Sequence, residues 1–137
     1  MTSKLNRHPK AVSISFTGFE CDPSEVENVL GKKATMVGLR GQPLRPNKTN
    51  LRRHSFAMYE LEFAEDVRLD EMIPALIEHL GGVEKIRLAR QTVAAKTLSF
   101  DVYLHVRNST AQEDGFLEVK TIEDLAYLNA SLGFSFP

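Results

Sequence analysis

Apolar and polar residues alternate with a period of two along several stretches of this chain, as they do in strands that bury one face. In the first stretch, Val12, Ile14 and Phe16 alternate with serine and threonine. The clearest stretch carries Phe100 and Val102 in phase. The pattern predicts strands at Ala11–Gly18, Ala34–Leu39, Ser55–Phe63, Lys85–Arg90, Thr97–Val106 and Phe116–Val119, a hairpin loop at Gln91–Lys96, and an edge strand in the tail Phe134-Ser135-Phe136.

A helix start follows the first strand, at Asp22-Pro23-Ser24-Glu25. Aspartate can accept hydrogen bonds from the free N–H groups of a first turn, and proline fits the first helical position because it has no N–H to lose. Gly31 predicts the end of this helix. Cys21 comes just before the cap, so we expect its thiol to pack on Val26 as a buried hydrophobic staple.

Two later segments follow the period of 3.6 residues that is typical of an amphipathic helix. The first runs from about Asp70 to Leu80 and stops at Gly81-Gly82. The second is predicted to start with Thr121 as its cap and to close at Gly133. Each helix therefore has a start signal or a glycine stop of its own.

The order of these elements predicts a single α+β domain over residues 11–137, preceded by a flexible arm at residues 1–10. We expect a mixed, largely antiparallel sheet with helices packed on one face, as in a ferredoxin-like fold or a related two-layer sandwich. The in-phase apolar positions of the strands and helices predict the core. They are Val12, Ile14, Phe16, Val26, Leu30, Leu61, Phe63, Met72, Leu76, Ile77, Leu80, Phe100, Val102, Leu104, Leu125 and Leu128.

The composition is typical of a globular protein with a hydrophobic core. A chain of 137 residues with 42% hydrophobic residues can bury a core without a metal or a disulfide. Cys21 is the only cysteine, which excludes an intrachain disulfide and any cysteine-rich metal site. The first ten residues lack the apolar segment of a signal peptide, and no apolar run is long enough to span a membrane. We expect a cytoplasmic protein.

Charge is distributed unevenly along the chain. Residues 1–54 hold ten Lys/Arg and four Asp/Glu (+6), and residues 55–137 hold seven and fourteen (−7), which sum to the net charge of −1. Such segregation is found in proteins with a polyanion-binding half. It also occurs where two oppositely charged halves attract each other, within one fold or across a dimer.

The segment from Lys32 to His54 is the best candidate for a binding site. Glycine and proline break its pattern, and loops longer than about 12–15 residues in small domains are usually functional or disordered. No acidic residue occurs between Glu27 and Glu60. The predicted binding residues are Arg40, Arg45, Lys48, Arg52, Arg53 and His54.

Three interpretations of this basic segment stay open. It is a solvated, charge-balanced loop, a surface for a protein partner, or a phosphate or nucleic-acid site. Nucleic-acid binding usually adds aromatic residues for stacking. No aromatic residue lies between Phe19 and Phe56, and the pI is about 6.4, so nucleic acid is the less expected partner.

Candidate catalytic groups are few. The chain has no recognised catalytic motif, and its four histidines lack metal-ligand spacing. Asp101, Tyr103 and His105 share the non-core face of a predicted strand, where a carboxylate could orient an imidazole as a base. Asp101 and His105 would be about 13 Å apart along one strand, so this enzyme hypothesis needs help from a neighbouring element such as His54. We assign no catalytic residue and expect no cofactor and no metal.

Several of these segments, taken together, resemble a known family. They are the strand Val12–Thr17, the helix that Asp22-Pro23 opens and Gly31 ends, Arg40-Gly41-Gln42, the strand Ser55–Phe63, the helix ending His79-Leu80, and Leu125 to Gly133 with the tail. Their order is similar to that of the bacterial domains of unknown function catalogued as family 4279. The chain lacks the tryptophan expected after the basic segment, where Phe56 and Tyr59 stand instead. The resemblance implies a small bacterial cytoplasmic protein with no assigned activity, so it supplies no site residues.

The leading hypothesis is a non-enzymatic protein-interaction module, of an accessory or immunity type, that binds another protein through residues 32–54. The alternatives are an anion- or nucleic-acid-binding module that uses the same segment, and an enzyme of unknown class that uses Asp101 and His105. We expect a monomer or a homodimer and no membrane partner.

Overall fold

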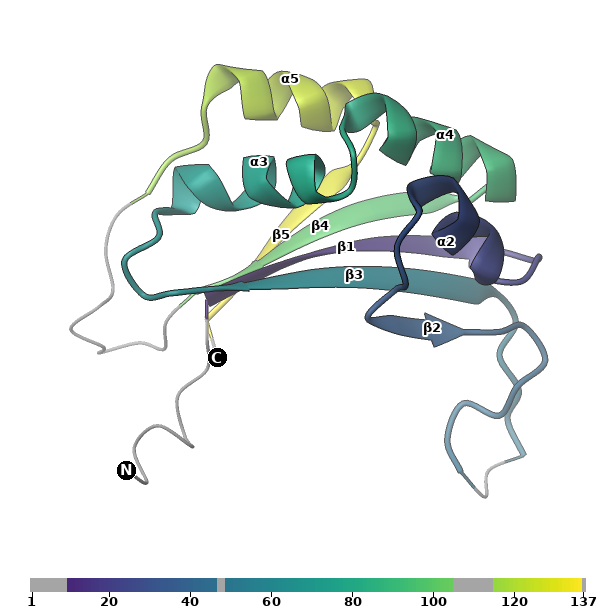
Figure 1. The fold of residues 1–137 in the computed structure, drawn as a ribbon. Helices are drawn as coiled ribbons and strands as arrows, with labels where there is room; N and C mark the ends of the chain where they lie inside the picture. Colours follow the sequence, from purple (N-terminus) through teal and green to yellow (C-terminus); the bar gives the residue numbers. More distant parts are fainter. Residues whose placement is uncertain (1–9, 47–48, 105–114, 137) are drawn as a thin grey trace, which may run out of the picture.

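The computed structural model describes residues 10–46, 49–104 and 115–136, which form an open five-stranded sheet with helices on one face (Figure 1). The strand order is β2-β3-β1-β4-β5, and neighbours are antiparallel except for the parallel pair β4 and β5. This confirms the predicted α+β class and the mixed, largely antiparallel sheet. The strands are β1 Lys10–Phe19, β2 Met36–Gly38, β3 Ser55–Phe63, β4 Thr97–Tyr103 and β5 Ser131–Ser135.

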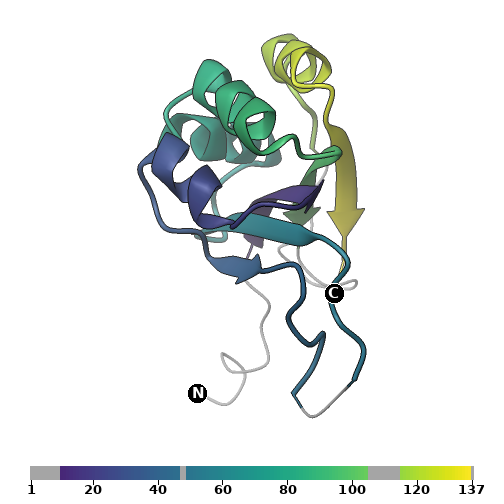
Figure 2. The same cartoon turned by 90° about the vertical axis from the view of Figure 1, so that its right-hand side faces the viewer.

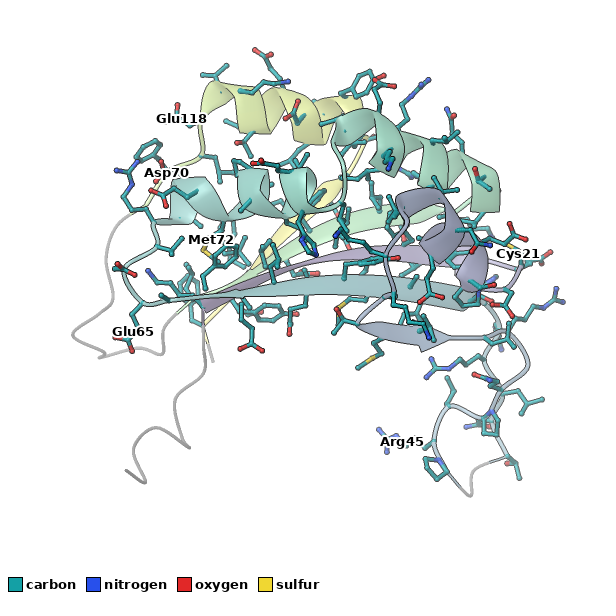
Figure 3. All side chains as sticks on the ribbon, in the orientation of Figure 1. Cys21, Arg45, Glu65, Asp70, Met72 and Glu118 are labelled. Atoms are coloured by element: carbon teal, nitrogen blue, oxygen red, sulfur yellow. The ribbon has the colours of Figure 1, made fainter. Side chains whose placement is uncertain are left out.

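The four helices in the described residues all lie on the same side of this sheet (Figure 1). They are α2 Ser24–Leu30, α3 Leu69–His79, α4 Val83–Val93 and α5 Val119–Tyr127. Figure 2 shows α5 standing above β5, at one side of the group formed by the other helices. Figure 3 shows Met72 pointing from α3 toward the sheet. The opposite face of the sheet has no helix of the described residues on it.

Strand β1 occupies the centre of the sheet and is paired on both sides. Val12 lies opposite Leu61 of β3 and opposite Val102 of β4. Directly opposite residues of paired strands share a face, so the apolar positions of β1, β3 and β4 gather beneath the helices. The serine and threonine positions of β1 point to the uncovered face.

Most of the predicted core is buried. The predicted residues that are fully or nearly buried are Val12, Ile14, Phe16, Val26, Leu30, Met72, Leu76, Ile77, Leu80, Phe100, Val102, Leu125 and Leu128. Leu61, Phe63 and Leu104 are partly buried and pack against this cluster. The core has several further members that the predicted list does not include, which are Phe19, Ala57, Tyr59, Ile73, Ile86, Ala89, Val93, Ala95 and Leu98.

The predicted strand Lys85–Arg90 is wrong, because this segment belongs to α4. Ile86 and Leu88 suggested a period of two, but Leu88 is 53% exposed. The buried positions are Ile86, Ala89 and Val93, which are spaced as on one face of a helix. The helix extends through the first half of the predicted hairpin loop Gln91–Lys96, as far as Val93. The small side chain of Ala89 concealed the helical period.

The last helix is also shifted from its predicted position. It begins at Val119 and ends at Tyr127, and Thr121 is a buried residue inside it rather than its cap. Gly133 does not close the helix, because it lies in β5. The predicted short strand Phe116–Val119 is absent from the described residues. The predicted tail strand exists and begins earlier, at Ser131.

The predicted staple at Cys21 is wrong, because this cysteine is exposed (Figure 3). Pro23 is buried instead, and Val26 is fully buried. Asp22 accepts a hydrogen bond from the first turn of the helix, as predicted. Its Oδ1 accepts this bond, of 2.9 Å, from the backbone N–H of Ser24. That bond lowers the pKa of the Asp22 carboxyl below its usual range.

Two predicted segments extend beyond the described residues. Residues 1–9 of the predicted arm lie outside them, and Lys10 is the first residue of β1. The Lys10 side chain is buried, and its Nζ donates hydrogen bonds of 2.8 Å to the carbonyl oxygens of Glu65 and Val67. At the other end, β4 is described as far as Tyr103, and His105 lies outside the described residues.

Arg90 on α4 connects the residues that follow its own helix with the residues that follow α5. Its Nη1 donates to the carbonyl oxygens of Leu128, at 2.7 Å, and Asn129, at 3.1 Å. Its Nε and Nη2 donate to those of Ala95 and Lys96, at 3.3 and 3.0 Å. One guanidinium thus satisfies carbonyls after α4 and after α5, where helices leave such groups without partners. It fixes where β4 begins and where the chain turns into β5.

We expect Phe100→Ala to lower the free energy of unfolding by about 3–5 kcal/mol, because it leaves a cavity in a fully buried position. Urea denaturation measures this change. The control is Leu88→Ala, at a half-exposed position on α4, which should change the free energy much less. Equal losses for the two variants would contradict the assignment of the core.

We expect Arg90→Lys to lower the free energy of unfolding by about 1.5–3 kcal/mol, the range for hydrogen bonds to a charged group. A lysine keeps the charge but cannot reach carbonyls on both sides with one ammonium group. Arg87→Lys is the matched control, since Arg87 makes an exposed pair with Glu84. If both lysine variants were as stable as the parent protein in urea, Arg90 would not hold these segments.

Candidate functional site

The basic segment that follows β2 forms a two-stranded ribbon rather than an irregular loop. We call residues 39–54 the basic ribbon. The N–H of Gly41 donates to the carbonyl oxygen of Arg52 at 3.0 Å, and the N–H of Arg52 donates to that of Gln42 at 2.7 Å. These bonds continue the antiparallel pairing of β2 with β3 beyond the sheet. Figure 1 shows the ribbon projecting from the sheet on the side opposite the helices.

The outer part of the basic ribbon is also held by backbone contacts. Pro43 and Leu51 form an isolated antiparallel bridge. The N–H of Leu44 donates to the carbonyl oxygen of Asn50 at 2.9 Å. Gly41 has a φ of +89°, a conformation that side chains disfavour and glycine permits. The ribbon is thus a defined structure up to residue 46 on one strand and from residue 49 on the other.

A close contact fixes the base of the basic ribbon. The Arg52 guanidinium lies over the ring of Phe56, 4.9 Å from its centroid, which is a cation–π geometry. Gly38 lies beneath both groups. A Cβ added there would clash with Phe56 Cε1 and would be 2.9 Å from Arg52 Cζ. Only glycine lets these two side chains lie against the backbone of β2.

The structure separates the predicted arginines into two pairs. Arg52 is engaged by Phe56, and Arg40 makes an ion pair of 3.4 Å with Glu20. Arg45 and Arg53 have no ion pair within the described part of the chain. Figure 3 shows Arg45 projecting from the ribbon. Two positive charges are therefore presented to solvent without a neutralising neighbour.

The two remaining predicted residues contribute less to this picture. His54 is exposed and lies at the end of the ribbon next to β3. Lys48 lies outside the described residues. The segment therefore carries Arg40, Arg45, Arg52, Arg53 and His54 on one projecting ribbon. The sequence predicted a long loop here and gave no sign of the backbone pairing.

Exposed leucines accompany the arginines, and the sequence analysis missed them. Leu44 is 48% exposed and Leu51 is 55% exposed. Together with Thr49, Asn50 and Arg53 they line an open hollow of ≈ 580 Å³ on the ribbon. The spacing of single leucines between arginines gave no signal in the sequence, because neither a helix period nor a strand period ran through the segment.

The acidic half of the chain forms a separate surface. A groove of ≈ 1040 Å³ runs between α5 and the junction of α3 with α4. Its acidic lining residues are Glu78, Glu84, Glu123 and Asp124. Lys120 pairs with Asp124 at 2.6 Å, so part of this charge is neutralised in place. Because the groove lies on the helix side and the basic ribbon projects from the other side, the two charged surfaces do not neutralise each other (Figure 1).

Within the described residues the enzyme hypothesis gains no assembled site, and the His105 on which it depends lies outside them. Asp101 lies on the uncovered face of β4, opposite Ser13 of β1, and its Oδ1 approaches Gly133 of β5. His54 precedes β3, on the other side of β1. Ser13 faces Glu60, six residues along the chain from His54, so His54 lies roughly 20 Å from Asp101 along the strand direction. The described residues do not bring these two groups together.

No metal centre emerges from the described residues, since no group of three His, Cys, Asp or Glu side chains converges there. Among those residues, no helix has the length and apolar character needed to cross a membrane.

Tyr59 anchors the segment that leads into β2. Its hydroxyl donates a hydrogen bond of 2.7 Å to the carbonyl oxygen of Lys32. The ring is almost fully buried, at 3% exposed. Burial, followed by the negative charge of Glu27, raises the pKa of Tyr59 to about 12. The neutral phenol is thus the form that holds the start of the basic segment against β3.

We expect the protein to lose stability between about pH 10 and pH 12 through Tyr59. The unfolded chain releases this proton near pH 10, whereas the folded protein retains it to about pH 12. The unfolded state is therefore favoured progressively across that window. The difference in urea midpoint between the parent protein and Tyr59→Phe, followed against pH, measures this contribution. A difference that stays constant from pH 9 to about pH 12 would contradict it.

Comparison with known proteins agrees with the resemblance seen in the sequence. No curated protein and no solved structure gives a match to the chain. The family model described as "Domain of unknown function (DUF4279)" matches residues 6–136, which include every strand and helix described above. The chain therefore belongs to the DUF4279 family.

Proposed function

We propose that this protein is an interaction module that binds an acidic surface of another protein through the basic ribbon. The observation that carries this proposal is the pairing of unneutralised arginines with exposed leucines. Arg45 and Arg53 lie on the same projecting element as Leu44 and Leu51. Arginine is enriched at protein interfaces, and apolar contacts at the centre supply much of their binding energy.

Order in the basic ribbon favours binding over a merely solvated loop. A segment that is already held by backbone hydrogen bonds loses less conformational freedom when a partner docks on it. The bridge between Pro43 and Leu51 and the contact of Arg52 with Phe56 hold the ribbon in one shape. These contacts support a preformed recognition element at the edge of the sheet.

A protein partner fits the basic ribbon better than a nucleic acid does. Single strands are usually bound by aromatic side chains that stack on the bases, and residues 39–54 contain none. Exposed leucines add nothing to phosphate binding but fit an apolar patch on a protein. The accessory or immunity-type role suggested by the sequence is the biological form that this binding would take.

We expect Arg45→Ser/Arg53→Ser to weaken partner binding by at least about tenfold, since arginine hot spots are worth about 2 kcal/mol or more. The measurement is capture from a lysate of the native host, followed by titration of the identified partner. Stability in urea should change by less than about 0.5 kcal/mol, because both side chains are exposed.

The matched control is Lys32→Ser/Lys33→Ser, which removes the same charge from two exposed residues outside the ribbon. Equal weakening by both double variants would reduce the effect to net charge and contradict a site on the ribbon. Titration of single- and double-stranded oligonucleotides tests the alternative. Binding to them with a steep salt dependence that falls with each arginine removed would favour a nucleic-acid module instead.

A further inference from the structure

Strand β5 ends the sheet, and its outer side has no strand beside it in the described residues. The N–H of Leu104 donates to the carbonyl oxygen of Ser135, so the backbone of Ser135 faces β4. Backbone groups alternate in direction along a strand. Leu132 and Phe134 therefore turn their N–H and C=O groups outward, where they form a template for another strand.

This edge lacks the features that usually keep sheet edges apart. Natural proteins protect exposed edges with charged residues, prolines or bulges. From Asn129 to Phe136 the sequence contains neither a charged residue nor a proline. Phe134 is 47% exposed at this edge. An apolar, uncharged edge strand indicates that something pairs with it.

The flank of α5 above the edge extends the same apolar surface. The residues of α5 fall on three sides of the helix, of which one is buried and one lines the groove. Thr121, Leu125 and Leu128 are buried, whereas Lys120, Glu123, Asp124 and Tyr127 line the groove toward α3 and α4.

The third side of α5 carries Val119, Ile122 and Ala126, spaced as one stripe of a helix. Val119 is 69% exposed and Ile122 is 52% exposed. Since α5 stands above β5 (Figure 2), the side that faces away from α3 and α4 faces the same way as the free edge of β5. The stripe and the edge thus form one surface.

We propose that two copies of this chain pair through β5, antiparallel and about a two-fold axis at Gly133, so that their sheets become continuous. In this register Leu132 exchanges two backbone hydrogen bonds with the partner's Phe134, and the same pair forms again across the axis. The side chains of both residues lie on the helix-facing side, because Leu132 lies beside Phe100 and Phe134 beside Val102. The α5 stripes then meet above the joined strands.

A second copy fits this edge because the surface is complementary to itself. Outward-facing Leu132 meets Phe134 in both directions, and Gly133 meets the partner's Gly133, with the Asp101 side chain of each copy lying over its own glycine. The strand itself, from Asn129 to Phe136, contributes no charged residue; the carboxylate beside it is that of Asp101 on β4, and the net charge of the chain is only −1. Two-fold homodimers are also the commonest closed assembly of soluble proteins.

The edge at β5 is separate from the basic ribbon, which continues β2 and β3 at the opposite side of the sheet. The dimer does not depend on the proposed function. Ribbon variants should leave it intact, and edge variants should leave each ribbon intact. Failure of one proposal is therefore distinguishable from failure of the other.

Sedimentation equilibrium of the full chain, over a wide range of concentrations, tests the dimer. We expect a mass of twice 15.4 kDa at high concentration. Phe134→Lys and, independently, Ile122→Lys should shift the protein to the monomer mass, because each places a charge where it meets its own copy. Leu88→Lys, at a position on α4 with 53% exposure, is the matched control and should still dimerise. Circular dichroism establishes that each variant is folded.

Disulfide trapping tests the register. In a Cys21→Ser background, Ser131→Cys is mixed with Ser135→Cys under mild oxidation. Ser131 lies opposite the partner's Ser135 in the proposed pairing, at a distance that a disulfide spans. We expect a covalent dimer from the mixture and none from either variant alone, since like positions would be about 13 Å apart.

A chain that stays monomeric at every concentration overturns the proposal and leaves the edge for the strand of a different protein. A dimer that survives both lysine variants, or crosslinks of either cysteine variant with itself, also overturns it. If Phe134→Lys does not fold, Ile122→Lys and the mixed cysteine pair still decide the outcome.

Discussion

The structure depends on the helix-facing side of β1, which is paired on both edges and covered from above. Val12, Ile14 and Phe16 are all fully buried there. β3 and β4 both pair with this strand, one on each side. Its three apolar side chains therefore lie at the centre of the core. Helices cover only this face, so the molecule can meet others at its two outermost strands, at the uncovered face and on the outer sides of the helices.

The two edge strands differ in how their unpaired backbone groups are protected from pairing with other strands. At β2 the chain continues into the basic ribbon, whose arginines provide the charge that discourages unspecific edge pairing. At β5 no such charge is present. Arg90 makes this second edge possible, since it binds the carbonyl oxygens of Leu128 and Asn129 just before β5 begins. A helical residue thereby positions the strand at the far side of the sheet.

The sequence predicted the parts of the fold whose period matches their burial. In β4 every second residue is buried, and in β1 the buried apolar residues alternate with serine and threonine, so alternation alone identified the strands and most of their core residues. It failed for α4, where Ile86 and Leu88 imitate a strand and the small Ala89 conceals the helix. It also failed for Arg90, because a side chain that binds distant carbonyls leaves no local pattern.

The candidate site was predicted in composition but not in shape. The absence of acids and the clustered arginines identified the segment, since these are properties of the sequence itself. Its ordered ribbon depends on pairing between residues six to eleven positions apart. It also depends on Gly38, because there is no room for a side chain beneath Phe56 and Arg52. The exposure of Leu44 and Leu51 depends on this geometry as well. None of these can be inferred from residue types alone.

The uneven distribution of charge along the sequence corresponds to two separate surfaces of the folded protein. The opposite charges of the two halves of the chain would neutralise each other if the basic ribbon lay against the acidic groove. The ribbon and the groove instead lie on opposite sides of the molecule (Figure 1). A nearly neutral protein therefore presents a basic surface and a partly neutralised acidic surface on opposite sides. If two copies join through β5, their ribbons lie at the two outer ends of one continuous sheet, because β2 is at the far side of each copy. Two ribbons held at a fixed separation would bind a repeated or dimeric acidic partner far more tightly than one, without any new contact.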